Sequence, residues 1–96
     1  MGRQEAEQII VNYLQNFKLR KVGIFGSYAR NEQNSNSDID ILVKFNKTPS
    51  LLQLIRIENE LSKRLGCKVD LVTEDSITNK IIKSQINKEL QIIYHA

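Results

Sequence analysis

The sequence has almost none of the residues from which proteins build disulfides and zinc sites. It contains one cysteine, Cys67, and one histidine, His95. An internal disulfide needs two cysteines, and structural zinc sites usually take four Cys or His ligands, so both kinds of site are disfavoured. A single thiol fits a reducing compartment. We therefore expect a cytoplasmic protein.

Long apolar runs are missing as well. No run approaches the roughly 20 residues that a membrane-spanning helix requires. The first residues, MGRQEAEQII, lack the apolar centre of a signal peptide. The sequence therefore predicts no membrane partner. Because repeats and low-complexity segments are also absent, we expect residues 1–96 to form a single domain.

The charge balance gives only a mild signal. Fourteen basic and 11 acidic residues leave a net charge of +3, and the basic residues are scattered along the chain. Such a charge helps to attract a nucleotide. It is too small and too dispersed to indicate binding to duplex DNA, which we do not expect.

Hydrophobic periodicity predicts alternating helices and strands. A Thr48-Pro49 pair is typical of a helix start, and Gly66 of a left-handed helix stop. Asp75 or Ser76 is the expected cap of the last helix. The predicted order is helix 3–17, strand 21–26, a short helix beginning at 28–30, strand 38–45, helix 49–65, strand 67–72, a helix through 77–86 and strand 90–96. This order predicts an α/β fold with about four helices packed on a small sheet.

Two aspartates stand out in the segment DIDILVKF. Alternation along a strand places Asp38 and Asp40 on one face and the apolar residues Ile39 and Ile41 on the other. Carboxylates two residues apart lie about 6–7 Å apart along the strand and repel each other. A hard divalent cation relieves this repulsion, and Mg²⁺ is typically held by one or two carboxylates together with substrate phosphates.

Two further features fit the same chemistry. Asp70, in the next predicted strand, would complete a second metal position, and two ions can clamp the attacking and leaving oxygens of a phosphoryl transfer. Gly26 lets the backbone approach a ligand, while the amides of Ser27 and Tyr28 and the Ser27 hydroxyl would cradle an anion. Arg30, a turn later, would reach a phosphate oxygen. The pattern therefore favours a triphosphate bound with metal ions.

Each of these features is common by itself. A lone Asp-x-Asp pair usually faces solvent, a Gly-Ser pair is usually a plain turn, and an isolated strand Asp can protect a sheet edge. The combination is much rarer. Gly-Ser, ten residues and Asp-x-Asp should arise by chance in roughly one chain in a thousand of this length.

This combination resembles the signature of the DNA-polymerase-β-like nucleotidyltransferase superfamily. The segments FGSYAR, SDIDILV and VDLVT are typical of its minimal nucleotidyltransferases, the MNT-domain proteins. The resemblance implies a mixed sheet and nucleotidyl transfer from a nucleoside triphosphate. It also implies that Gly26 and Ser27 hold the triphosphate and that Asp38, Asp40 and Asp70 bind two Mg²⁺ ions. Arg30 matches a frequent basic position, whereas Asn31 departs from the glycine that often follows it.

The resemblance also implies a partner. MNT proteins are commonly antitoxins that transfer AMP from ATP to a tyrosine of a HEPN-domain toxin, a helical RNase. A chain of 96 residues leaves no room for a second, acceptor-binding domain, so we expect the acceptor on a partner molecule. Two alternatives stay open: a non-catalytic binding module that masks the partner, and a nucleotidyltransferase that acts on a small molecule or tRNA.

Overall fold

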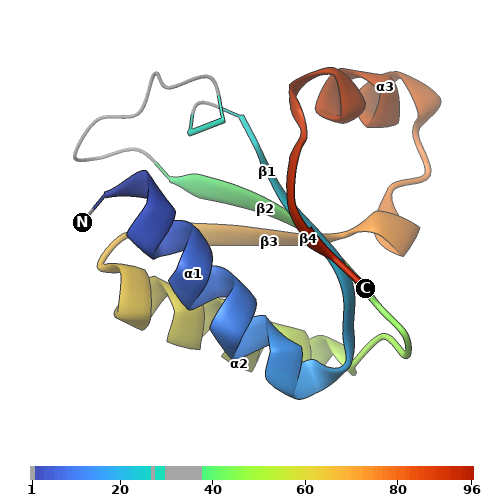
Figure 1. Ribbon diagram of the computed structural model, residues 1–96. Helices are drawn as coiled ribbons and strands as arrows, with labels where there is room; N and C mark the ends of the chain where they lie inside the picture. Colours follow the sequence, from blue (N-terminus) through green and yellow to red (C-terminus); the bar gives the residue numbers. More distant parts are fainter. Residues whose placement is uncertain (1, 27, 30–37) are drawn as a thin grey trace.

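The computed structural model describes residues 2–26, 28–29 and 38–96 (Figure 1). These residues contain three α-helices, two short 3₁₀ helices and four strands. In chain order the elements are α1 (Arg3–Leu14), η1 (Gln15–Phe17), β1 (Leu19–Phe25), β2 (Ile39–Phe45), α2 (Leu51–Leu65), β3 (Val69–Thr73), η2 (Glu74–Ser76), α3 (Lys80–Glu89) and β4 (Gln91–His95).

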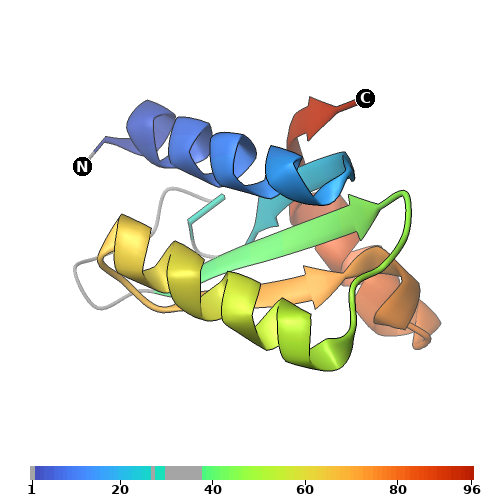
Figure 2. The ribbon, with the colours of Figure 1, turned by 90° about the horizontal axis from the view of Figure 1, so that it is seen from below.

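The four strands form one mixed sheet in the order β3-β2-β1-β4. Strands β2 and β3 are parallel, because α2 crosses between them, and β1 is antiparallel to both β2 and β4. Helices α1 and α2 lie on one side of the sheet and α3 on the other (Figures 1 and 2). The α/β class and the mixed sheet expected from the sequence are confirmed.

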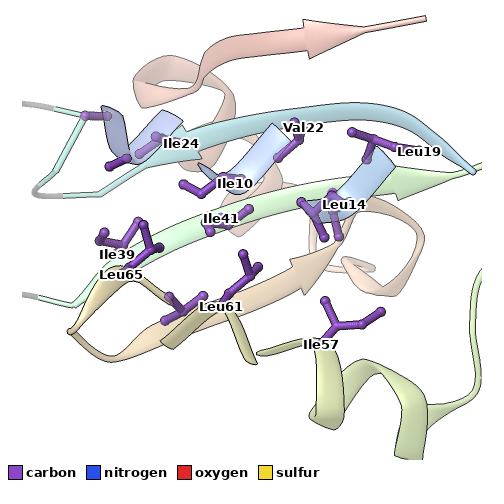
Figure 3. Close-up of a cluster of buried hydrophobic side chains, with 14 of the residues drawn as sticks. Ile10, Leu14, Leu19, Val22, Ile24, Ile39, Ile41, Ile57, Leu61 and Leu65 are labelled. Carbon is purple, nitrogen blue, oxygen red and sulfur yellow. The ribbon is translucent and has the colours of Figure 1, made fainter. Parts of the chain in front are cut away.

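The hydrophobic core fills the space between the sheet and the pair α1 and α2 (Figure 3). Alternate residues of β1 and β2, such as Val22, Ile24 and Ile41, point into it and are fully buried. Ile10 of α1 and Leu61 of α2 cover them from the helix layer. The opposite face of β2 carries Asp40, the buried Leu42 and Lys44.

Helix α2 begins two residues later than the sequence indicates. Ser50, not Thr48, is the N-cap, and its hydroxyl accepts a hydrogen bond from the Gln53 N–H at 3.2 Å. The serine hydroxyl satisfies one of the unpaired amides of the first turn, so it fixes the start of the helix. The expected stop is confirmed, because Gly66 adopts a left-handed φ of 70°.

The buried stripe of α2 also differs from the expected one. The apolar periodicity of the sequence predicts one side formed by Leu51, Leu54, Ile55, Glu58, Leu61 and Leu65. Leu51 and Ile55 are instead 75% and 46% exposed, whereas Ile57 is fully buried. The helix is rotated so that polar side chains meet the edge of the sheet. Ser62 Oγ accepts from the Val69 N–H at 3.1 Å, and a Glu58 carboxylate oxygen accepts from the Leu71 N–H at 2.7 Å. Helix α2 therefore closes the β3 edge.

Three other helix predictions differ from the structure. The α-helical part of α1 ends at Leu14, and residues 15–17 tighten into η1. The segment expected to cap α3 instead forms η2, and Asn79 is the cap, accepting from the N–H groups of Ile81 and Ile82. The short helix expected at residues 28–30 is not found at its described positions, since Tyr28 and Ala29 lie in a turn. In the described part of the chain, no helix is both long and apolar enough to span a membrane.

Candidate active site

Asp40 and Asp70 lie side by side on the sheet face opposite α1 and α2. Asp40 is paired in register with Asp70 of the parallel strand β3 and with Phe25 of the antiparallel strand β1. Its neighbours in sequence, Ile39 and Ile41, are buried in the core, so the Asp40 side chain must point to the other face. The structure thus brings together the two aspartates that the sequence places on neighbouring strands.

The carboxylates near Asp40 make it harder to ionise. Burial is the largest effect that raises the pKa of Asp40, followed by the charges of Asp70 and Asp38, a hydrogen bond with Asp70, and the charge of Glu89. All of these favour the protonated form. A cation placed among the carboxylates would reverse this effect.

Asp38 stands at the entry to β2, one residue before the strand begins. The next residue, Ile39, donates its N–H to the Lys68 carbonyl at 3.0 Å, which ties this entry to the entry of β3. Asp38 is half-buried, and its charge adds to the burial that raises the pKa of the Cys67 thiol. It therefore lies at the border of the site, between Asp40 and Cys67.

The described residues contain no group of three His, Cys, Asp or Glu side chains close enough together to hold a metal ion. The role of all three aspartates as ligands of two Mg²⁺ ions stays a prediction. The donor chemistry of the adjacent pair Asp40 and Asp70 does fit Mg²⁺. This ion prefers oxygen ligands, and it often takes one or two carboxylates and completes its shell with water and phosphates.

Gly26 ends β1 directly against Asp40. Its φ is +76°, a backbone conformation that side chains with a Cβ rarely adopt, and a Cβ built there would overlap the Asp40 carboxylate. Glycine is therefore needed for two independent reasons. The turn after β1, described at Gly26, Tyr28 and Ala29, can approach the aspartates only because this side chain is missing.

The remaining predicted phosphate-binding residues are described only in part. Tyr28 is half-buried and packs against the core, with the Arg3 guanidinium 5.9 Å from its ring centroid. Burial raises the pKa of its hydroxyl, and the charge of Arg3 opposes that effect. Ser27 and Arg30 lie outside the described residues, so their predicted roles stay predictions.

The comparisons with known proteins agree with this geometry. The family model described as "Polymerase beta, Nucleotidyltransferase" matches residues 7–96. The chain belongs to this nucleotidyltransferase family. MJ1217 of Methanocaldococcus jannaschii is 51% identical over 74 residues, which cover 77% of this chain and 76% of that protein. The protein adenylyltransferase MntA of Thermococcus cleftensis is 42% identical over 76 residues, with 79% of this chain and 77% of MntA covered.

Comparison with solved structures supports the same nucleotidyltransferase fold. A toxin–antitoxin crystal structure with AMP-PNP superposes with a TM-score of 0.85 at 28% identity, covering 94% of this chain and 73% of that chain. A tri-AMPylated Shewanella oneidensis HEPN toxin in complex with MNT antitoxin matches with a TM-score of 0.81 at 25% identity, covering 99% and 74%. The resemblance expected from the sequence is confirmed, and the chain is an enzyme of the nucleotidyltransferase class.

Two residues near the site of this nucleotidyltransferase are missed by sequence reasoning. Glu89, at the end of α3, accepts a hydrogen bond from the Gly26 N–H at 3.2 Å across 63 residues of sequence. Gln91, at the start of β4, donates from its side-chain amide to the Ala29 carbonyl at 3.0 Å. Neither lies in a motif, so only the pairing of β4 with β1 reveals them.

Proposed function

We propose that this nucleotidyltransferase transfers AMP from ATP, with Mg²⁺, to a tyrosine hydroxyl of a partner protein and that the partner is a HEPN-domain toxin. The observation that carries the proposal is the adjacent pair Asp40 and Asp70 placed against the Gly26 turn. The naming of MntA as a protein adenylyltransferase and the likeness to MNT antitoxin structures with HEPN toxin support the choice of reaction and partner. A cytoplasmic location, expected from the cysteine content, stays a prediction.

The proposed chemistry is an in-line displacement at the α-phosphorus of ATP. The acceptor oxygen forms a bond to the α-phosphorus while the bond to the bridging oxygen of the β-phosphate breaks, so pyrophosphate leaves with that oxygen. Asp70 takes the proton of the acceptor hydroxyl. Asp38 and Asp40, with Asp70, would hold Mg²⁺, which when bound neutralises the charge of the triphosphate and of its leaving group.

The turn after β1 would hold the nucleotide. Because Gly26 has no Cβ, the phosphate chain can come close to the backbone beside Asp40. In this proposal the amides of Ser27 and Tyr28, the Ser27 hydroxyl and the Arg30 guanidinium bind phosphate oxygens. Their role is to orient the α-phosphorus toward the acceptor, which is the main contribution a protein makes to phosphoryl transfer.

Exposed apolar side chains support a protein partner. Several large apolar residues lie on the surface of α2, α3 and β4: Leu51, Leu52, Ile55, Ile81, Ile82 and Ile92. Contiguous exposed apolar side chains commonly mark protein interaction surfaces, and Ile81 and Ile82 are adjacent on α3. Helix α3 also borders the active site through Glu89. A partner bound along α3 would therefore place an acceptor residue near the aspartates.

Intact-mass spectrometry tests the proposal directly. The chain, its co-expressed HEPN partner and Mg-ATP should yield a partner heavier by one or more AMP groups. Asp40→Asn should lower the transfer rate by about a thousandfold or more, because it removes part of the charge that holds the metal. Asp75→Asn is the matched control, since Asp75 is largely exposed and lies on η2. Wild-type rates in Asp40→Asn, or label found on RNA or a small molecule instead, would contradict the proposal.

A steric antitoxin is the second candidate, and the exposed apolar residues favour it equally. In that case Asp40→Asn would still neutralise the RNase activity of the partner although no AMP is transferred. Measuring neutralisation and mass change on the same samples separates the two functions.

A further inference from the structure

We propose that the junction between α3 and β4 positions the phosphate-binding turn, with Glu89 and Gln91 as positioning residues. This inference rests on the proposed function, because it assigns these residues to the binding of the ATP phosphates. Neither residue would touch the nucleotide. Each would act through the backbone of the turn described at Gly26, Tyr28 and Ala29.

The Glu89 side chain extends the hydrogen bonding of the sheet just before β4 begins. The last registered pair between β1 and β4 joins Ile24 with Gln91, which is the first residue of β4. The residues that precede Gln91 in the sequence belong to the end of α3. At the next position outward, Gly26 donates its N–H to a Glu89 carboxylate oxygen at 3.2 Å. A side chain thus takes the place of a strand carbonyl and fixes the direction in which the backbone leaves β1.

Gln91 holds the other end of the turn. Its amide nitrogen donates to the Ala29 carbonyl at 3.0 Å, and its amide oxygen accepts from the Arg3 guanidinium of α1. Arg3 also lies over the Tyr28 ring. The turn is therefore held at Gly26 from α3, at Ala29 from β4, and at Tyr28 from α1.

The charge of Glu89 favours positioning over direct nucleotide binding. A carboxylate repels phosphates, so it cannot be a phosphate ligand itself. It can, however, accept the Gly26 N–H and leave the amides further along the turn to face the nucleotide. The competing interpretation is that Glu89 only occupies a phosphate position until ATP arrives.

Two substitutions at Glu89 separate these interpretations. Glu89→Gln keeps an oxygen that accepts the Gly26 N–H, whereas Glu89→Ala removes the acceptor. If Glu89 positions the turn, Glu89→Ala should raise the KM for ATP and the Kd for Mg-ATP by about tenfold, and Glu89→Gln should stay within about threefold of wild type. The kcat should also fall in Glu89→Ala, because the turn orients the α-phosphorus toward the acceptor, and it should stay near the wild-type value in Glu89→Gln.

Asn79→Ala is the matched control. Asn79 caps α3 at its other end and forms no hydrogen bond with the described residues of the turn. This variant weakens the same helix, so it should lower thermal stability but leave the KM for ATP unchanged. Gln91→Ala should raise the KM about threefold, since the hydrogen bond to the Ala29 carbonyl is lost together with the one accepted from Arg3.

The outcomes that overturn the inference are specific. Tighter ATP binding in both Glu89 variants would show that Glu89 competes with phosphate. An equal rise of KM in Asn79→Ala would show that α3 acts only as general support.

Hydrogen exchange of the Gly26 amide, measured without nucleotide, gives a readout that does not depend on the proposed function. Exchange should be faster in Glu89→Ala and unchanged in Glu89→Gln. Unchanged exchange in Glu89→Ala would overturn the inference even if the enzyme transfers AMP. Faster exchange in a protein that neither binds Mg-ATP nor modifies its partner would instead refute the proposed function.

Discussion

Asp40 and Asp70 are register partners on two parallel strands, and their carboxylates are close enough to hydrogen bond when one of them is protonated. Without a cation, this pair costs the folded state free energy. In the proposed function the same pair would bind a cation. Activity and stability should therefore respond in opposite directions when one charge is removed.

Asp40→Asn should stabilise the metal-free protein while it abolishes AMP transfer. The folded-state pKa of Asp40 is raised, so stability falls as pH rises from the unfolded-state pKa through the folded-state pKa. Removing the charge should raise the melting temperature measured in EDTA at pH 7. The gain should vanish below the ordinary Asp pKa. A lower melting temperature at pH 7 would contradict this account of the pair.

Gly26→Ala should cost far more stability than Gly66→Ala. Both glycines have a positive φ, +76° and +70°. In both variants the alanine must therefore adopt a left-handed backbone conformation, which lowers the free energy of unfolding by about 1–2 kcal/mol. A Cβ at position 26 would also overlap the Asp40 carboxylate, whereas nothing lies within 4 Å of one at position 66. Denaturant unfolding of the two variants measures the difference. Equal losses would mean that Asp40 moves aside freely.

Glu74→Gln should destabilise the protein at neutral pH and not in acid. Glu74 accepts a hydrogen bond from Lys21 Nζ at 2.6 Å and pairs with Lys44 at 3.4 Å, and these contacts lower the pKa of its carboxyl. The stability they contribute is present above the unfolded-state pKa and is lost as pH falls through the folded-state pKa. We expect a loss of about 1 kcal/mol at pH 7, measured by denaturant unfolding.

Glu60→Gln is the control for the Glu74 variant. Glu60 forms a more exposed pair with Arg64 one turn along α2, so its loss should be smaller. If Glu74→Gln shows the same loss at pH 7 and in acid, the two lysines do not stabilise the ionised carboxylate.

Ser50→Ala should destabilise the protein by about 1 kcal/mol, and Thr48→Ala should have little effect. The Ser50 hydroxyl accepts the Gln53 N–H, whereas Thr48 precedes the cap of α2. Thermal unfolding of the two variants checks which residue caps the helix. A larger loss of stability in Thr48→Ala would show that Thr48 caps the helix, as the sequence predicts.

The features of the site that can be predicted from the sequence depend on local contacts or on the alternation of side chains along a strand. Alternation along β2 fixes the face of Asp40 once Ile39 and Ile41 are known to be buried. The segment VDLVT supplies Asp70 in the same way, and both aspartates then meet because β2 and β3 are neighbours. The positive φ of Gly26 likewise follows from its place between a strand and a turn.

The rest depends on long-range packing that no local pattern encodes. Glu89 resembles any other acidic residue near the end of a helix until β4 is paired with β1. The rotation of α2 follows from the polar edge of β3, which needs Glu58 and Ser62, and not from the count of apolar residues. Thr48 and Ser50 are both suitable caps by residue type, so the packing of the helix decides between them.

The hydrogen bonds from β3 to Glu58 and Ser62 also decide how copies of this protein can associate. A fibre that grows by edge-to-edge pairing of sheets requires two open edges on every molecule, because each molecule must pair with one neighbour on either side. With the β3 side already occupied by its own helix, a newly added strand has to join beside β4. Association through strands can then produce a pair of molecules but cannot propagate beyond it.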